Sequence, residues 1–455
     1  MAASDFLIAE FQESPVPEGS PRFVGMPVTP GKPGVVIGMR RVGKTYLMYQ
    51  RMRALIDSGV DKRDLLYANF EDDRLQPAAA GLLDGLLEAF FRASPDARRR
   101  RAYLFLDEIQ MVPEWPRFVR RVLDTEQVEI MVSGSSAKLL HTEVATELRG
   151  RGIAVEVFPY SFAESAVAAG IALPTQSPPG SQARSQLEAH LDRYLTVGGF
   201  PEVQAMPLTD RVQTLQDYVE LVLLRDVIER HRVENATAAR AFARLLLQSP
   251  AHTFSVNKAH GDLRSRGLAV SKDLLHALLD HFQDAYLVFA IPVFKKSLRA
   301  QATNPRKLYA IDPGLGAAMS HVTATDVGAR LENAVFLELR RRHGRLLQGQ
   351  VSYYLTASGH EVDFVVGDLF EQRAGRLVQV CASLAEPATR AREVRALSAA
   401  MAETGLRTAE IVTLHEEETI TTDAGAIAVV PAWRWLLGGR PQPDVGPADS
   451  GRSLI

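Results

Sequence analysis

The sequence is informative first for what it has little of. Its 455 residues include one cysteine, Cys381, so no disulfide can form within the chain, and a reducing compartment fits. The longest apolar run, AYLVFAIPVF (residues 285–294), is far too short to cross a bilayer. The first residues are acidic where a signal peptide carries basic ones. These shortages predict a soluble, cytoplasmic protein with no membrane partner.

An excess of charge of either sign is also missing. The chain has 52 Lys and Arg against 54 Asp and Glu, for a formal net charge of −2. No basic field therefore covers the whole molecule, and any contact with nucleic acid has to come from a local patch. Hydrophobic residues make up 46% of the chain, which is ordinary for a globular protein.

Apolar strands alternate with helical stretches from Gly34 to about Phe158. The strand segments are GVVIG, LLYANF, AYLFLDE and EIMVSGSS. This alternation is typical of βαβ units, so we expect an α/β fold with a parallel sheet. At this length one hydrophobic core is not enough, and about two to four domains are expected.

A phosphate-binding loop follows the first of these strands. Residues Gly38–Thr45 fit the pattern G-x-x-x-x-G-K-[ST] and open a helix. The glycines permit a tight turn whose N–H groups wrap phosphates, and the helix N-terminus adds a positive dipole end. Lys44 is expected to bridge the β- and γ-phosphates of ATP, and the Thr45 hydroxyl to bind Mg²⁺. The predicted nucleotide-binding residues are Gly38, Met39, Arg40, Arg41, Val42, Gly43, Lys44, Thr45 and Tyr46.

Two acids complete this chemistry. The segment YLFLDEIQ describes a buried strand that delivers Asp107 and Glu108 at its C-terminal end, beside the loop. We expect Asp107 to hold the Mg²⁺ shell, and Glu108 to orient or deprotonate the attacking water. Ser133, at the end of EIMVSGSS, is a candidate for positioning water near the γ-phosphate, although turn chemistry explains SGSS as well.

An arginine that stabilises transferred phosphoryl charge raises the rate of hydrolysis by several powers of ten. The segment ELRGRG supplies Arg151, and behind it Arg149, on a loop. We take Arg151 as the candidate catalytic arginine. The alternative is an ordinary surface arginine, and the sequence does not distinguish action on its own nucleotide from action on that of a neighbouring copy.

Long ordered motifs resemble one family. They are GMRRVGKTYL, YANFEDDRL, LDEIQMVPEWPRFVRRVLD, SGSSAKLLHTEVATELRGRGIAVEVFPYSF, GGFPEV and LRDVIER. The chain resembles the bacterial and archaeal AAA-type (AAA+ superfamily) ATPases fused to domain of unknown function 4143, from Val35 to about Val430. The resemblance implies an AAA+-like P-loop core, a helical lid, a winged helix, and a C-terminal α/β domain with a restriction-endonuclease-like fold. It also allows self-association, since AAA+ proteins include rings.

Composition and resemblance together predict the division of the chain. The expected segments are a flexible N-terminal arm (1–30), the P-loop ATPase core (31–170), a linker or insertion (171–186), the helical lid (187–240), the winged helix (241–328), the endonuclease-like domain (329–437) and a disordered tail (438–455).

The expected winged helix contains a short helix that ends at the glycine of RSRG and a second helix capped by Ser271. A hairpin with a basic tip follows. In a DNA-binding role, the helix after Ser271 enters the major groove and the basic residues of the hairpin meet phosphates. Those residues are Lys295, Lys296, Arg299 and Arg306. The acidic residues of the same helix favour the alternative, a module for protein contact or packing.

The C-terminal segment places acids as an endonuclease-like site requires. Asp363 stands in the position of the essential aspartate, with Glu361 beside it and Glu332 on a preceding helix. Such a site also needs a lysine one strand on, where this chain reads Gln379-Val380-Cys381. A buried cysteine is no cation, so we expect no nuclease activity and a scaffold for nucleic acid or a protein instead.

The leading hypothesis is an AAA+-type ATPase that binds and hydrolyses ATP with Mg²⁺, as a switch or motor acting on DNA or other nucleic acid. The alternative is a slow-turnover, ATP-binding regulatory protein whose C-terminal domain binds a protein partner.

Overall fold

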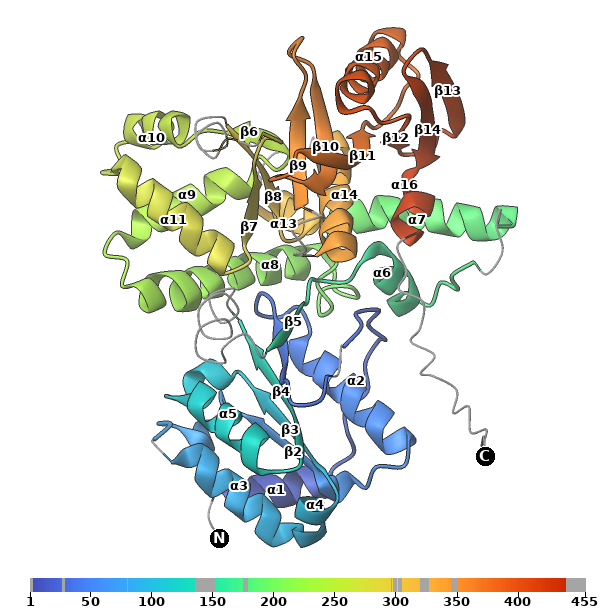
Figure 1. The fold of residues 1–455 in the computed structure, drawn as a ribbon. Coiled ribbons are helices and arrows are strands. Elements are labelled where there is room, and N and C mark those ends of the chain that lie inside the picture. Colours follow the sequence, from blue (N-terminus) through green and yellow to red (C-terminus); the bar gives the residue numbers. More distant parts are fainter. Residues whose placement is uncertain are drawn as a thin grey trace.

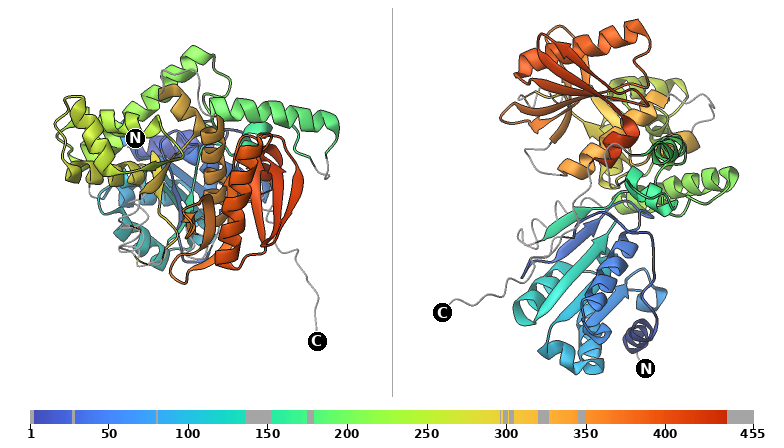
Figure 2. Two further views of the ribbon diagram at one scale, coloured as in Figure 1. Left: turned by 90° about the horizontal axis from the view of Figure 1, so that it is seen from above. Right: turned by 90° about the vertical axis from the view of Figure 1, so that its right-hand side faces the viewer.

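The computed structural model describes most of the chain. The described residues are 3–26, 29–79, 81–135, 152–174, 179–295, 297, 301, 305–319, 327–344 and 350–438. The predicted α/β class is confirmed: a parallel sheet lies at one end of the molecule and a mixed sheet at the other (Figure 1). Helices of the middle segment lie between them, as the right-hand view of Figure 2 also shows.

The N-terminal unit is built on five parallel strands in the order β2-β3-β4-β1-β5. The residues of β1, β3 and most of β4 are mainly apolar and buried, as expected for a sheet that is covered on both faces. The strands are β1 (Gly34–Ile37), β2 (Leu65–Asn69), β3 (Ala102–Asp107), β4 (Val128–Gly134) and β5 (Ile153–Glu156). The helices are α1 (Ala3–Glu13), α2 (Lys44–Asp57), α3 (Leu82–Ala93), α4 (Pro95–Arg99) and α5 (Trp115–Thr125).

The segment expected to be a flexible arm is packed against this unit. Residues 3–13 form helix α1, whose Ile8 is buried, and α1 lies against α3 (Figure 1). Farther along, the Arg22 side chain is buried beneath the phosphate loop. The Pro, Gly and Ser content that suggested a loose arm instead belongs to an extended stretch between these two anchors.

The middle segment is helical, as predicted for residues 187–240, but its helices begin earlier, at Phe162 in the expected core and at Ser181 in the expected linker (171–186). It comprises α6 (Phe162–Ala168), α7 (Ser181–Val197), α8 (Leu208–Val222) and η5 (Leu223–Glu229). The last of these is a π-helical turn that continues α8 without a break. Such turns often occur at functional sites.

A unit of mixed helices and strands follows. Its elements are α9 (Ala236–Leu247), β6 (His252–Phe254), α10 (Val256–Ser265), α11 (Lys272–Asp284), β7 (Val288–Ile291) and β8 (Arg306–Ala310). The strands pair antiparallel in the order β6-β8-β7. Two local predictions are confirmed: Ser271 caps α11 by accepting from the Leu274 N–H, and α10 ends just before Gly267, whose φ is 80°.

The C-terminal unit is a six-stranded mixed sheet in the order β13-β14-β12-β11-β10-β9. Its strands are β9 (Gln350–Leu355), β10 (Glu361–Asp368), β11 (Arg373–Val380), β12 (Thr408–Thr413), β13 (Glu418–Thr422) and β14 (Gly425–Pro431). Its helices are α14 (Val327–His343), α15 (Pro387–Thr404) and α16 (Ala432–Leu437), and α13 (Pro313–Met319) precedes them. The predicted turn between β9 and β10 is confirmed, with Gly359 in a left-handed conformation.

Among the helices in the described part of the chain, none is both long and apolar enough to span a bilayer.

Candidate functional site

The loop between β1 and α2 has the backbone that its glycines predict. Gly38 has φ 155°, and a Cβ there would lie 2.1 Å from the Val157 carbonyl oxygen. Gly43 has φ 94°, in the left-handed region that favours glycine. Side chains at these two positions would therefore clash or strain the turn, so the pattern is explained by backbone geometry.

Lys44 is buried, and its ammonium group is surrounded by acceptors. Its Nζ lies 3.2 Å from the Gly38 and Met39 carbonyl oxygens and 3.2 Å from Glu108 Oε1. A buried cation is tolerated only when it is paired in this way. The same position suits a phosphate group, which would compete with Glu108 for the ammonium.

The two acids lie at the C-terminal end of β3, as predicted. Asp107 is fully buried and accepts hydrogen bonds from the Thr45 hydroxyl, at 2.6 Å, and from the Ser133 hydroxyl. The Ser133 oxygen in turn accepts from the Glu108 N–H at 2.9 Å. Ser133 therefore holds the acid pair in place, while its expected contact with an attacking water stays a prediction.

The surroundings shift the pKa values of these two neighbouring carboxyl groups in opposite directions. Burial, together with the charge of Glu108, raises the pKa of Asp107. Burial is the largest single effect on Glu108 and acts in the same direction, but the Lys44 ammonium, the hydrogen bond from Gln110 and the charge of Arg40 together outweigh it and lower the pKa of Glu108 below its usual value. Glu108 is therefore ionised at neutral pH.

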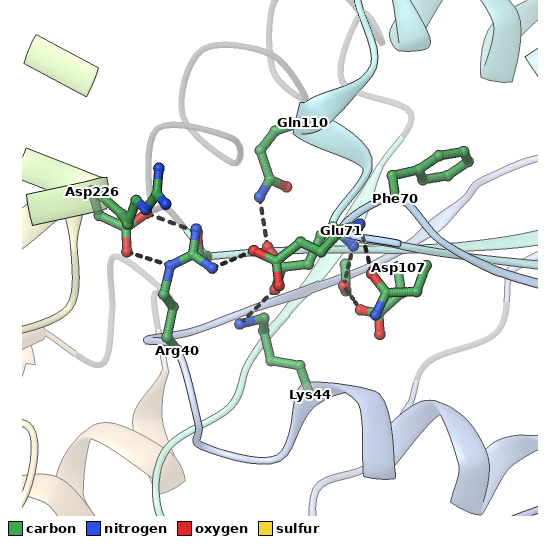
Figure 3. Close-up of polar contacts among 12 residues, drawn as sticks. Arg40, Lys44, Phe70, Glu71, Asp107, Gln110 and Asp226 are labelled. Atoms are coloured by element: carbon green, nitrogen blue, oxygen red, sulfur yellow. Dashed lines mark hydrogen bonds and ion pairs between the residues drawn. The ribbon is translucent and has the colours of Figure 1, made fainter. Parts of the chain in front are cut away.

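Arg40 of the phosphate loop forms an ion pair that the sequence did not predict (Figure 3). Arg40 donates from Nε to Asp226 at 2.9 Å and also pairs with Glu71. Asp226 belongs to the π-helical turn η5 and is buried, and its other oxygen accepts from the Ser135 hydroxyl at 3.1 Å. The sequence contained only an indirect signal, the motif LRDVIER, because 186 residues separate the two partners.

Arg40, Glu71 and Asp226 line a cavity of about 1410 Å³. Of the predicted nucleotide-binding residues, the cavity wall includes Arg40, Arg41, Gly43, Lys44, Thr45 and Tyr46, together with Asp107 and Glu108. Met39 and Val42 are buried in the core, so the loop offers their backbone and not their side chains. Arg225 and Arg230 also line the cavity, and both belong to the motif LRDVIER, to which the sequence assigned no role. The candidate arginines Arg149 and Arg151 lie outside the described residues.

Comparison with known proteins supports an ATPase domain around this cavity. Residues 31–166 match a family model described as an AAA domain, and residues 188–326 match one described as a domain of unknown function (DUF8612). Both matches end before the C-terminal sheet. The identity expected for that part, domain of unknown function 4143 with an endonuclease-like fold, therefore stays a prediction.

Curated relatives cover most of the chain. An uncharacterized protein of Methanocaldococcus jannaschii, MJ1544, is 32% identical over 424 residues, which are 91% of this chain and 90% of the relative. The chain belongs to the same family. An uncharacterized protein of Haemophilus influenzae is 25% identical over 334 residues, 73% of this chain and 78% of its own length. The similarity to MJ1544 extends over the AAA domain and most of the units that follow it.

Solved structures give a distant likeness. The Walker-type ATPase PABY2304 of Pyrococcus abyssi is 14% identical, with a TM-score of 0.38 over 70% of this chain and 94% of its own. The Aeropyrum pernix Orc1 protein in complex with DNA is 13% identical, with a TM-score of 0.29 over 70% of this chain and 92% of its own. These values carry nothing about the ligands or partners of this chain.

A second charged cluster lies where the three-stranded unit meets the C-terminal sheet. The acids expected there converge, and they surround a lysine that the sequence did not single out. Lys307 of β8 places its Nζ 2.9 Å from Glu332 Oε1, 2.8 Å from Glu361 Oε1 and 2.9 Å from Asp363 Oδ1. The expectation that this site has no lysine is therefore wrong, because the lysine comes from another unit and not from the strand after Asp363.

At the motif position itself, Gln379-Val380-Cys381, there is no cation, as read from the sequence. Gln379 turns its amide N–H toward Glu393, at 2.7 Å, and its oxygen toward the Asp363 N–H. Cys381 is buried, and burial raises the pKa of its thiol to about 12, so it is inert at neutral pH. Within the described part of the chain, neither side chain forms a hydrogen bond or ion pair with Lys307.

Arg22 braces the phosphate loop from beneath. Its guanidinium donates to the Val42 carbonyl at 2.7 Å, to the Phe158 carbonyl at 2.6 Å and to Glu164 at 3.0 Å. Both Arg22 and Glu164 are buried. Val42 directly precedes Gly43, so the N-terminal segment fixes the turn on which phosphate binding depends.

We expect Arg22→Ala to lower the free energy of unfolding by about 3–5 kcal/mol, because it leaves the Glu164 carboxylate buried without its partner. We also expect weaker nucleotide binding, because the Val42 carbonyl loses its donor. Denaturant unfolding and titration with a fluorescent ATP analogue measure the two effects.

Arg92→Ala serves as the control, since Arg92 is exposed and pairs with Asp5 at the surface. It should change the free energy of unfolding by less than about 1 kcal/mol. Arg22→Lys keeps the charge but not the three-way contact, and should recover part of the loss. Unchanged nucleotide affinity in stably folded Arg22→Lys and Arg22→Ala proteins would restrict Arg22 to a structural role.

The second cluster makes a prediction about pH. Burial, together with the charge of Asp363, raises the pKa of Glu332 to about 8. Between its unfolded value near 4.5 and 8 the folded state holds a proton that the unfolded state lacks, so stability falls as pH rises through this window. Glu332→Gln should remove about 2–5 kcal/mol of that fall between pH 5 and 8. Denaturant unfolding at several pH values measures it.

A glutamine at 332 retains an acceptor for the Tyr309 hydroxyl, which donates to Glu332 at 2.7 Å. The control is Glu114→Gln, at an exposed side chain, which should keep the pH dependence of the unchanged protein. The same dependence in the Glu332→Gln variant would show that Glu332 is ionised in the fold at neutral pH.

Proposed function

We propose that the protein hydrolyses ATP with Mg²⁺ and uses the nucleotide state to drive a rearrangement on nucleic acid. The observation that carries the ATPase part is the convergence of Lys44, Thr45, Asp107 and Glu108 at one end of the sheet, in a domain of the AAA type. The hydroxyl of Thr45 and the carboxylate of Asp107 are the oxygen ligands that Mg²⁺ prefers. Bound there, the ion would neutralise charge on the phosphates.

Lys44 and Glu108 have different roles in the proposed hydrolysis. Lys44 exchanges Glu108 for a phosphate, and Glu108 is then free to orient a water molecule. Losing the Lys44 ammonium as a neighbour moves the pKa of Glu108 upward, toward the range in which a general base works well. The Lys44–Glu108 pair thus keeps the base occupied until nucleotide arrives.

Arg40 supports a link between the nucleotide and the rest of the chain. It lines the cavity and pairs with Asp226, whose turn η5 packs against α11. A γ-phosphate competes with Asp226 and Glu71 for the Arg40 guanidinium, because all three are anions. A change in this pairing shifts η5 and with it α11, which belongs to the unit expected to meet nucleic acid.

The unit formed by residues 236–310 supports nucleic-acid binding through its charge and order. Helix, strand, two helices and two strands succeed one another as a winged helix requires. Lys258, Arg264 and Arg266, on and just after α10, are exposed and form no ion pair with other described residues. The exposed residues of α11 include Asp273 and Asp280 beside Lys272. We therefore assign phosphate contacts to α10. The sequence had placed them on the hairpin, at Lys295, Lys296, Arg299 and Arg306, of which Lys296 and Arg299 lie outside the described residues.

The Lys44→Ala variant should lose ATP binding or turnover by a factor of at least about 100, because no other ammonium group occupies the described loop. Phosphate release at saturating ATP and Mg²⁺ measures turnover. Lys62→Ala, at a lysine away from the cavity, is the control and should retain full activity. Turnover that survives in Lys44→Ala would place the ATP site elsewhere in the chain.

DNA or RNA should stimulate turnover and bind with an affinity that falls steeply with salt. We expect the double variant Arg264→Ala/Arg266→Ala to reduce the slope of log affinity against log salt by about two, one for each phosphate contact. Fluorescence anisotropy with labelled single- and double-stranded oligonucleotides measures the slope. Arg92→Ala/Arg117→Ala removes the same charge from exposed sites on α3 and α5, and should leave the slope unchanged.

ATP turnover that ignores DNA and RNA, without salt-dependent binding, would contradict the nucleic-acid part of the proposal. That result would favour the regulatory alternative, in which the C-terminal domain binds a protein partner.

A further inference from the structure

Three side chains with metal-ligating atoms meet where the helix that continues η5 ends against α11. His231 follows Arg230 at the end of that helix, and His281 and Asp284 lie three residues apart on α11. The ligand atoms of the three residues all lie within 4.8 Å of one another. The two imidazole rings are stacked, with centroids 3.6 Å apart and an angle of 13° between their planes. Side chains far apart in sequence thus form one cluster.

The donor set fits a transition metal of the zinc type. Two imidazole nitrogens and one carboxylate oxygen are ligands that Zn²⁺ binds at about 2.0–2.2 Å, with water in the fourth tetrahedral position. Tetrahedral ligands at such distances lie about 3.3 Å from one another. The observed separations of up to 4.8 Å close when the half-buried side chains rotate. Because the lone pair of a ring nitrogen lies in the ring plane, ion binding also turns the two imidazole rings out of their stacked arrangement. Imidazole nitrogens favour a transition metal, whereas the oxygen ligands that Thr45 and Asp107 offer favour Mg²⁺, so the two sites select different ions.

The backbone adds to the attraction for a cation. His281 and Asp284 are in the last turn of α11, and His231 is in the last turn of the helix that continues η5. The C-terminal end of a helix carries a partial negative charge from its unpaired carbonyl groups. Two such ends lie beside the same three side chains, and Asp284 adds a full negative charge.

We propose that His231, His281 and Asp284 bind one Zn²⁺ ion, which fastens η5 to α11. Asp226, the partner of Arg40, precedes His231 on the same continuous helix, and Arg230 lines the nucleotide cavity. In Figure 1, α11 lies beside the end of the long helix that starts as α8. The ion cross-links these two elements, so that a movement of η5 at the cavity also moves α11. Metal binding itself does not depend on the proposed action on nucleic acid.

The test uses the full chain after treatment with a chelator and its removal. Co²⁺, a spectroscopic substitute for Zn²⁺, should give visible absorption bands of a nitrogen- and oxygen-bound ion, at one equivalent per chain, that Zn²⁺ abolishes. His281→Ala and, separately, Asp284→Asn should weaken Zn²⁺ binding at least about tenfold in competition titrations. Zn²⁺ should raise the melting temperature of the unchanged protein and not that of the variants.

His276→Ala is the matched control, since His276 is exposed on the same helix and outside the cluster. It should keep the Co²⁺ spectrum and the Zn²⁺ affinity of the unchanged protein. Retained binding of an ATP analogue shows that each variant is folded. No Co²⁺ spectrum in the unchanged protein, or a spectrum that survives in both cluster variants, would overturn the proposal.

Discussion

A lysine ammonium group that leaves water must be surrounded by acceptors, and this constraint shapes both charged centres of the protein. Lys44 and Lys307 are each at most 5% exposed. The first is held by two carbonyl oxygens and Glu108, and the second by three acidic side chains. Each lysine comes from one segment and its acids from others. The same requirement therefore positions the elements around each centre.

The two centres differ in whether a ligand can reach the lysine. At Lys44, one acid partner is replaceable, because a phosphate offers the same charge and the cavity is open to it. At Lys307, burial and three acids leave the cation enclosed. Lys307 holds the three-stranded unit to the C-terminal sheet, since β8 supplies the lysine and α14 and β10 supply the acids. One lysine thus faces a cavity, and the other joins two units.

The sequence predicted local features well where neighbouring residues decide the conformation. The glycines of the phosphate loop, the Ser271 cap and the turn at Gly359 all depend on a few consecutive backbone angles. The pair Asp107 and Glu108 was also predicted, because an apolar strand that ends in two acids after a phosphate loop is a specific pattern. The predicted arm at 1–30 was less accurate, since composition does not reveal that α1 packs on α3 or that Arg22 reaches the loop.

The sequence by itself therefore determined the class of fold, the phosphate loop and its acids, because hydrophobic period, glycine backbone freedom and motif spacing are local properties. Only the tertiary structure decided which distant side chains meet. Arg40 with Asp226, Lys307 with the acids around Asp363, and His231 with His281 are each brought together by packing across long sequence separations. The hydrophobic period of a segment and the neighbouring residues determine which face of a helix or strand a side chain occupies. The residue that it contacts on another element depends on how whole helices and strands pack together.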